Sequence, residues 1–219
     1  MKIVVIADIH GRIERLERAS ADLAAADWVV LTGDVTNFGR RAEAERMLER
    51  IEAHNTHILA VPGNCDYPEA EAVLSERGYN LHASQRVIDG VVWLGLGGSL
   101  PAPGGTPNEY SEEELAGLLE AASVGLDDSV PLLLISHQPP ADTKLDRIHA
   151  GAHVGSRSVR QFIEQRQPLA CFTGHIHEAA GLDHIGDTLL VNPGPLGTGR
   201  YALASVSPDW QVEAEILGS

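Results

Sequence analysis

Five short apolar runs, each followed by residues that commonly ligate metals, constrain the fold of this 219-residue chain more than any other feature. The runs cover residues 3–7, 29–31, 58–61, 132–135 and 169–173, and apolar residues fill both of their faces, as in buried parallel strands. In chain order they lead to Asp8 and His10, Asp34, Asn64, His137, and His175 and His177. Open α/β sheets bind ligands at the carboxyl edge of their strands. We therefore expect one metal cluster at that edge, with Asp34 at its centre.

The intervals between these runs predict helices and a second block of strands. Helical spacing or capping signals predict helices over residues 12–26, 41–53 and 68–77. A capping box at Ser111 and Glu114 predicts a helix that ends near residue 122, and Ser156 or Ser158 caps a further helix. The pair Asp89-Gly90 predicts a hairpin of residues 85–88 and 91–97. Residues 188–191, 201–206 and 211–217 are expected to be antiparallel strands. The order predicts a single domain over residues 1–219, with two sheets packed face to face and helices outside.

The charge of the chain limits its partners. Asp and Glu number 31 against 16 Lys and Arg, which gives a formal net charge of −15. Binding to nucleic-acid backbones or anionic membranes depends on cationic side chains. We expect neither stable nucleic-acid binding nor membrane association, although a small phosphate compound held by metal ions escapes this objection. Two cysteines, no export signal and no run long enough to span a bilayer favour a cytoplasmic protein.

The ligand set favours two metal ions rather than one. Asp8 and His10 are two residues apart, as are His175 and His177, so each pair can face one ion from extended backbone. With the three remaining ligands the chain offers more donors than one tetrahedral ion uses. A bridging carboxylate can hold two cations about 3.5 to 4 Å apart, and Asp34 suits that role. Mixed His, Asp and Asn donors favour Mn²⁺, with Fe, Zn²⁺ or Ni²⁺ as alternatives.

The ordered motifs Asp8-Ile9-His10-Gly11, Gly33-Asp34, Gly63-Asn64-Cys65-Asp66, His137 and Gly174-His175-Ile176-His177 resemble those of calcineurin-like metallophosphoesterases. The resemblance implies a four-layer α/β/β/α sandwich of two mixed β-sheets flanked by helices. It also implies one ion held by Asp8, His10, Asp34 and His177, and a second held by Asp34, Asn64, His137 and His175. The Gly-Asn-Cys-Asp variant is similar to a small prokaryotic branch that favours phosphodiesters.

The same resemblance implies hydrolysis of a small soluble phosphoric ester by a hydroxide that bridges the metals. Asn64 and Cys65 are the candidate catalytic residues. Many relatives carry histidine where Cys65 stands, and cysteine is a poorer proton donor. Cys65 could equally be a packing substitute. His153, on a long loop, is a candidate replacement donor, and Arg12 a candidate substrate contact, as is Arg200.

Three other functions stay open. The same metals could serve a phosphomonoesterase or nucleotidase, and nuclease action on long DNA is less favoured because the chain is acidic. A protein-binding scaffold of this fold that lacks catalysis is the third, and the filled ligand positions count against it. Exposed edges of the terminal antiparallel strands could support a homodimer, although no residue demands one.

Overall fold

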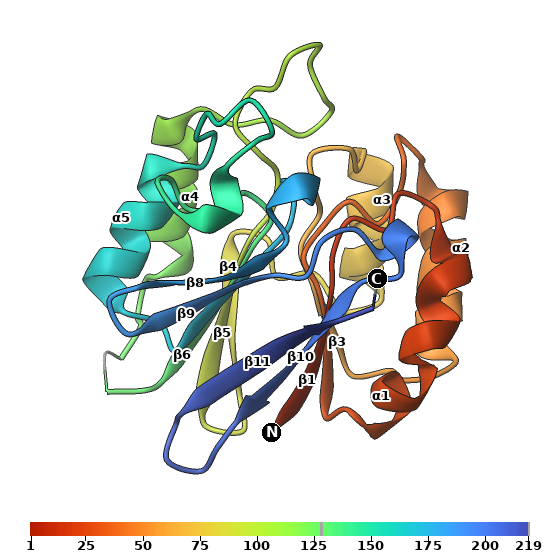
Figure 1. Ribbon diagram of the computed structural model, residues 1–219, viewed down its shortest axis with the longest axis horizontal. Helices are drawn as coiled ribbons and strands as arrows, with labels where there is room; N and C mark the ends of the chain where they lie inside the picture. Colours follow the sequence, from red (N-terminus) through yellow and green to blue (C-terminus); the bar gives the residue numbers. More distant parts are fainter. Residues whose placement is uncertain (128, 219) are drawn as a thin grey trace.

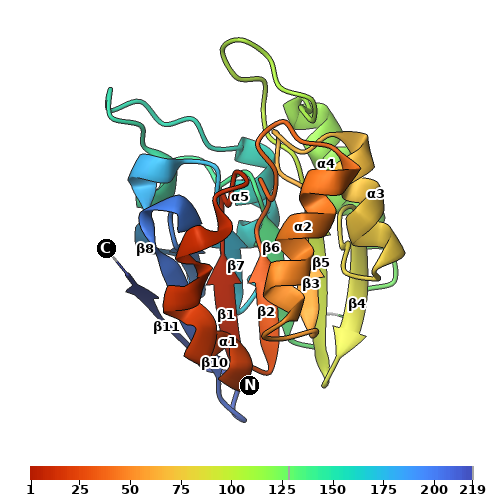
Figure 2. The same ribbon diagram turned by 90° about the vertical axis from the view of Figure 1, so that its right-hand side faces the viewer.

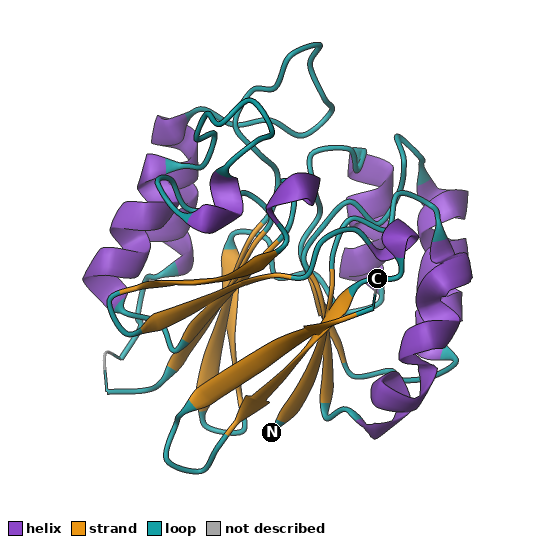
Figure 3. Ribbon diagram, viewed as in Figure 1, coloured by secondary structure: helices purple, strands orange, loops and turns teal. Residues whose placement is uncertain are grey.

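The computed structural model describes residues 1–127 and 129–218, which form two mixed β-sheets packed face to face with helices on both outer faces (Figures 1 and 3). The first sheet has the strand order β11-β10-β1-β2-β3 and the second β4-β5-β6-β7-β9-β8. The predicted four-layer sandwich is confirmed.

The first sheet carries three parallel strands at its centre and edge. These are β1 (Lys2–Ile6), β2 (Trp28–Leu31) and β3 (Ile58–Ala60), with Ile3 opposite Trp28 in the β1–β2 pair. The hairpin of β10 (Tyr201–Val206) and β11 (Val212–Leu217) adds to the sheet by antiparallel pairing of β10 with β1. The C-terminal hairpin thus joins the sheet that the N-terminal strand begins.

The second sheet is built around four parallel strands with an antiparallel strand at each edge. The parallel strands are β5 (Val91–Leu96), β6 (Leu132–Ser136), β7 (Ala170–Thr173) and β9 (Thr188–Asn192). The edges are β4 (Ser84–Ile88), which forms the predicted hairpin with β5, and β8 (Gly181–Ile185). Sequence analysis missed β8. Its turn to β9, Gly186-Asp187, is a two-residue hairpin signal that could have revealed it.

Helices cover each sheet from outside. The segments η1 (Ile13–Ala19), α1 (Ser20–Ala25), α2 (Arg41–Glu52) and α3 (Pro68–Glu76) cover the first sheet, which Figure 2 shows from that side. The second sheet is covered by α4 (Glu112–Ala122) and α5 (Arg157–Arg166). Three short 3₁₀ turns, η2 (Lys144–Asp146), η3 (His177–Ala179) and η4 (Leu196–Thr198), lie in loops. No described helix is long and apolar enough to cross a bilayer.

The helix expected over residues 12–26 is instead a 3₁₀ helix followed by a short α-helix. Ile13, Leu16 and Ala19, its buried residues, are three apart, which is the 3₁₀ repeat rather than the 3.6-residue α repeat. The two helix starts predicted from caps, those of α4 and α5, are confirmed. Ser111 and Glu114 form the expected capping box, and Ser156 rather than Ser158 caps α5 by accepting from Val159 N–H. Each such cap stabilises its helix by about 0.5 to 2 kcal/mol.

A continuous apolar layer lies between the sheets. Ile3, Val5 and Val30 from the first sheet pack with Trp93 and Phe172 from the second, and all five are fully buried. This layer fixes the two sheets against each other. Because the parallel strands of both end on the same side of the molecule, the polar residues that follow them come together there.

Candidate metal centre

Both sheets supply side chains to one cluster beyond the carboxyl ends of their parallel strands. Asp8 and His10 follow β1, Asp34 follows β2, and Asn64, Cys65 and Asp66 follow β3. From the second sheet, His137 follows β6, and His175 and His177 follow β7. All seven side chains expected to ligate metal lie in this region.

The side chains fall into two neighbouring groups that share Asp34. In one, His10 Nε2 lies 3.1 Å from His177 Nε2, and His177 Nε2 lies 3.6 Å from Asp8 Oδ1. In the other, Asp34, His137 and His175 each place a ligand atom within 4.8 Å of the other two. Asp34 Oδ2 lies 3.5 Å from His10 Nε2 and 3.6 Å from His137 Nε2. A single carboxylate oxygen therefore faces both groups, which is the arrangement of a bridging ligand.

The hydrogen bonds around His137 fit this residue to a cation. Its Nδ1 lies 2.7 Å from the carbonyl oxygen of Thr32, which can only accept, so Nδ1 carries the proton. Nε2 then has a lone pair, and it lies 2.9 Å from Asn64 Oδ1, a second acceptor. Two buried acceptors at this separation repel each other unless a cation lies beside both. The donor set therefore fits a divalent metal ion.

Burial and mutual proximity keep His175 and Asp8 in the protonation states that metals require. Burial lowers the pKa of His175 to about 3, with a smaller contribution from His137, so its ring is neutral. Burial alone would raise the pKa of Asp8, but the His177 contact and the charges of His137, His177 and His10 hold it below its usual value. Neutral imidazoles and an ionised carboxylate are the forms that bind cations.

Four of the ligands have a left-handed backbone that non-glycine residues rarely adopt. The φ angles are 51° at Asp8, 47° at His10, 51° at Asp34 and 68° at His175. Such strain clusters at functional sites and persists only where the surroundings enforce it. Here the enforcing contacts include the His175 N–H, which lies 3.1 Å from both Asp8 carboxylate oxygens, and the Cys65 N–H, which donates to Asp34 Oδ1 at 2.8 Å.

Two glycines allow the close approach of these loops. A Cβ at Gly63 would lie 2.0 Å from Asp34 Oδ1, and a Cβ at Gly33 would lie 2.4 Å from His137 Nδ1. Gly33 also has a φ of 104°. The Gly-Asp and Gly-Asn pairs of the sequence thus have a steric cause.

Asp66 joins the loops that follow β2 and β3. Its buried carboxylate accepts from the backbone N–H groups of Val35, Thr36 and Gly63 and from the Thr36 hydroxyl, at 2.8 to 3.1 Å. Burial and the charge of Asp34 raise the pKa of Asp66 to about 6 in spite of these bonds. Asp66 is the positioning residue to which sequence reasoning gave no role, although it stood within a quoted motif.

A second clamp holds the long loop before α4 against the metal centre. The side-chain amide of Asn108 donates to the Gly63 carbonyl at 3.0 Å, and its backbone N–H donates to the Asn64 carbonyl at 3.1 Å. This loop therefore forms a fixed wall beside Asn64. Nothing in the local sequence distinguishes Asn108, because its partners are 44 and 45 residues away.

Cys65, the candidate catalytic residue, lies at the centre with its side chain buried. Its sulfur is close enough to His10 and Asp34 to form a third group of potential ligand atoms. Burial, followed by the charge of Asp34, raises the pKa of the Cys65 thiol. The thiol form is thereby favoured.

The two candidate substrate contacts have different surroundings. Arg12 lines a cavity of about 690 Å³ that opens beside Asp8, His10 and His177, and His149, Asn37 and Arg200 line it too. His153 does not line this cavity. Its Nδ1 lies 2.7 Å from the buried Asp146 carboxylate, which also accepts from the N–H groups of Asp142, Thr143 and Gly155. His153 therefore helps to hold its own loop, and the structure does not bring it to the centre.

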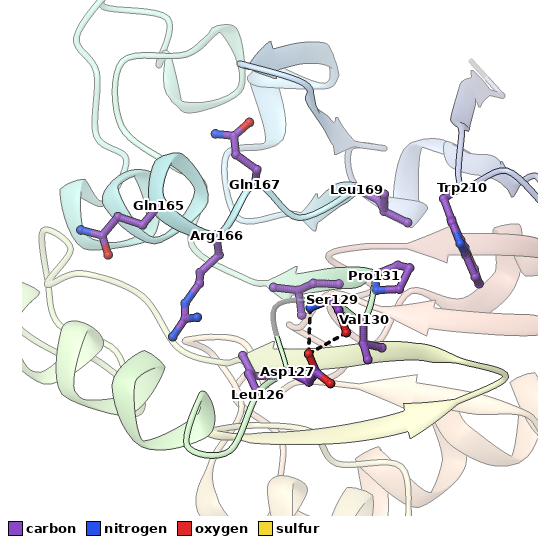
Figure 4. Close-up of a pocket in the computed structure, with 11 residues that line it drawn as sticks. Leu126, Asp127, Ser129, Val130, Pro131, Gln165, Arg166, Gln167, Leu169 and Trp210 are labelled. Atoms are coloured by element: carbon purple, nitrogen blue, oxygen red, sulfur yellow. Dashed lines mark hydrogen bonds between the residues drawn. The ribbon is translucent and has the colours of Figure 1, made fainter.

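A separate hollow lies at the opposite end of the second sheet, near the starts of β6 and β7 (Figure 4). Leu126, Val130 and Leu169 line it together with Arg166 and Trp210. The one carboxylate among the described residues that line it, Asp127, is engaged by the N–H and hydroxyl of Ser129. This hollow contains no group of potential metal ligands among the described residues.

The fold and the ligand cluster together define a metal-dependent phosphoesterase, and comparison with known proteins agrees. The chain belongs to the calcineurin-like phosphoesterase family, whose model matches residues 1–179. It is accordingly a hydrolase of phosphoric esters, in a family that uses divalent metal ions. The resemblance to the small prokaryotic phosphodiesterase branch is confirmed at the level of relatives.

Two relatives illustrate this placement, and one solved structure shares the fold. An uncharacterized protein of Methanocaldococcus jannaschii is 38% identical over 89% of this chain and 88% of its own length. The 3',5'-cyclic adenosine monophosphate phosphodiesterase CpdA of Escherichia coli is 27% identical over 84% of this chain and 68% of its own. The crystal structure of TT1561 from Thermus thermophilus has a TM-score of 0.73 and 22% identity, and covers 98% of this chain and 97% of the other.

Proposed function

We propose that this chain is a binuclear metal-dependent phosphodiesterase that hydrolyses a small phosphate ester. The observation that carries the proposal is the position of Asp34 Oδ2, 3.5 Å from His10 Nε2 and 3.6 Å from His137 Nε2, between the two groups of ligands. Asp8, His10, Asp34 and His177 would hold one ion, and Asp34, Asn64, His137 and His175 the other. Mn²⁺ suits these nitrogen and oxygen donors, and Fe, Zn²⁺ or Ni²⁺ are alternatives.

Two such ions, when bound, lower the pKa of a water and neutralise the charge that develops on the phosphate. The residues of the chain provide the geometry. Thr32 fixes the tautomer of His137, Asp66 aligns the loops of Asp34 and Asn64, and Cys65 places its sulfur beside His10 and Asp34. No side chain needs to be phosphorylated.

A diester substrate is supported by the relatives and by Cys65. CpdA is named a phosphodiesterase. A neutral, buried thiol is a weak proton donor for a leaving group. Esters with good leaving groups need less proton donation. A monoester also brings more negative charge to the site than a diester does. The acidic composition supports a small substrate in the cytoplasm rather than a long nucleic acid.

The test is hydrolysis of matched p-nitrophenyl phosphate monoesters and diesters by metal-free protein reconstituted with Mn²⁺. Asp34→Asn keeps the oxygen that accepts from Cys65 N–H but weakens the bridge, so we expect loss of diester cleavage and of bound metal. Asp187→Asn is the matched control, because Asp187 is exposed and its side chain has no partner among the described residues.

The outcomes separate the alternatives. Diester cleavage that requires metal and disappears in Asp34→Asn supports the proposal. A gain of monoester cleavage in Cys65→His would make Cys65 a determinant of specificity. Preference of the unmodified protein for monoesters would favour a phosphomonoesterase or nucleotidase. Two bound ions without cleavage of either class would contradict diesterase function and favour a protein-binding scaffold.

A further inference from the structure

The cavity beside the metal centre extends to one side of it. Asp8, His10 and His177 line the cavity, whereas Asn64, Cys65, His137 and His175 do not. Its outer wall is formed by the turn after β1 and by the loop that carries η4. The two segments are joined where Leu196 N–H donates to the Ala7 carbonyl at 3.0 Å. The cavity therefore has a wall that is fixed to the same strand that presents Asp8.

Two arginines lie on this wall, and neither has a side-chain partner in the part of the chain that the structure describes. Arg12 is the residue before η1, and Arg200 precedes β10. Within residues 1–127 and 129–218, neither guanidinium group forms an ion pair, a side-chain hydrogen bond or a ring contact. By contrast, the exposed Arg40, Arg41 and Arg50 are all paired with glutamates. Two unpaired guanidinium groups in one cavity of a strongly acidic chain attract anions.

The side chains of both arginines lie against glycines. A Cβ at Gly197 would lie 3.1 Å from Arg12 Cδ, and a Cβ at Gly194 would lie 3.3 Å from Arg200 Cδ. Any larger residue at these positions would displace the arginines. The stem of Arg12, and the stem and one guanidinium nitrogen of Arg200, thus lie against glycine backbone, and both residues line the cavity.

Two carboxylates, Asp8 and Glu178, also line the cavity, but neither forms an ion pair with Arg12 or Arg200 among the described residues. Asp8 belongs to the metal centre, and the Glu178 carboxylate accepts from the His149 N–H at 3.1 Å. Asn37 and Thr198 add neutral polar groups to the lining. A phosphate that two cations hold already has its charge compensated there. The arginines are therefore available for another anion on the same substrate.

We propose that Arg12 and Arg200 form a subsite for a second phosphate group, so that the preferred substrate is a small phosphodiester with one arm that ends in a phosphate. The cleavage of such a substrate rests on the proposed diesterase function. Guanidinium groups bind phosphate through paired, charge-assisted hydrogen bonds, which makes arginine the residue suited to such a subsite. The cavity, at about 690 Å³, has room for an arm of this size.

The experiment compares p-nitrophenyl phosphodiesters whose second arm is an alkyl chain of two to four carbons, either plain or ending in phosphate. Release of p-nitrophenol reports only the diester bond. We expect the phosphate-ended arm to lower KM by about tenfold or more at the best length, a change typical of charge-assisted hydrogen bonds. In Arg12→Gln and Arg200→Gln this preference should fall by a similar factor, because KM for the charged arm rises more than KM for the plain arm.

Two controls make the result specific. Arg15→Gln removes an exposed arginine from the same 3₁₀ helix that does not line the cavity, and it should keep the full preference. Phosphonate analogues, in which a methylene replaces the scissile oxygen, are titrated into the metal-loaded protein by calorimetry. These analogues test the subsite without turnover. Circular dichroism of each variant checks that it is folded.

Equal KM values for charged and plain arms in the unmodified protein would overturn the subsite. So would an equal rise in both KM values in the variants, which would assign the arginines to the reacting phosphate instead. If no diester is cleaved but the charged phosphonate still binds about tenfold more tightly and loses this advantage in both variants, the subsite stands and the catalytic proposal fails. Equal binding of both phosphonates refutes the subsite whether or not diesters are cleaved.

Discussion

Asp66 offers the sharpest test of how the metal centre is held together. The residue is 2% exposed, and its two carboxylate oxygens receive four hydrogen bonds. Oδ2 accepts from Val35 and Gly63, which lie on different loops, and Oδ1 accepts from the N–H and the hydroxyl of Thr36. Asp66→Asn keeps the size of the side chain but replaces one acceptor oxygen by a donor.

The magnitude follows from the less costly orientation of the new amide. If the NH₂ group faces Thr36, the Thr36 hydroxyl can turn to accept from it and donate to the Gly39 carbonyl, which lies 3.3 Å away. The Thr36 N–H is then left without a partner. One buried orphan donor costs about 1 to 3 kcal/mol, and the two bonds at the other oxygen weaken when they lose a charged acceptor. We expect the free energy of unfolding to fall by about 2 to 4 kcal/mol.

Urea denaturation of metal-free protein, followed by circular dichroism, measures this change without a contribution from bound ions. Asp187→Asn, on the surface, should stay within about 0.5 kcal/mol of the unmodified protein. At a urea concentration where Asp66→Asn is folded, kcat for a diester should also fall, because the Asp34 and Asn64 loops lose their common anchor. The reasoning is refuted if Asp66→Asn matches Asp187→Asn in both stability and kcat.

Three further predictions concern packing, pH and metal. In Gly63→Ala, the Cβ would lie 2.0 Å from Asp34 Oδ1, so kcat/KM should fall by about 100-fold or more, with less Mn²⁺ bound. Burial opposes ionisation of Glu112, but bonds from Ser156, Ser158 and Arg157 hold its pKa below the usual value. Its stabilising effect is present above the unfolded pKa, about 4.3, and is lost as pH falls through the folded pKa, so urea midpoints of Glu112→Gln should converge with the parent at low pH. When Mn²⁺ is added at about 100 times its Kd to protein from which a chelator has removed the metal, the Tm should rise by about 5 to 10 °C.

The position of the metal centre was predictable because it depends on few sequence-local facts. Each ligand follows an apolar run, and parallel strands end at one edge of a sheet. Asp34 is central in the structure because β2 lies between β1 and β3. The spacing of two residues between Asp8 and His10 also predicted a shared site, although for a partly wrong reason. Both residues have a left-handed rather than an extended backbone.

Other features of the structure were not predicted. His153 was a candidate substrate contact, but a buried carboxylate seven residues earlier in the chain, Asp146, engages it. The strand β8 is mostly half-buried and mixes polar with apolar residues, so it lacks the alternation that marks a strand in the sequence. The role of Asp66 emerges only when the loops after β2 and β3 lie side by side, because two of its donors are 30 and 31 residues away in the chain.

The left-handed ligands and the close glycines are two parts of one design. Asp34 has a positive φ, and its Oδ1 lies close to Gly63. Only the absence of a Cβ at Gly63 leaves room for this carboxylate oxygen. The strain of about 1 to 3 kcal/mol at each such residue must be offset by bonds that the extended backbone would not make, such as Cys65 N–H to Asp34 Oδ1. The bonds of Asp66 and Asn108 supply the remaining constraint on these loops. It follows that the geometry of the candidate ligands is set partly by residues outside the ligand set, and substitutions at those residues should lower catalysis before they unfold the protein.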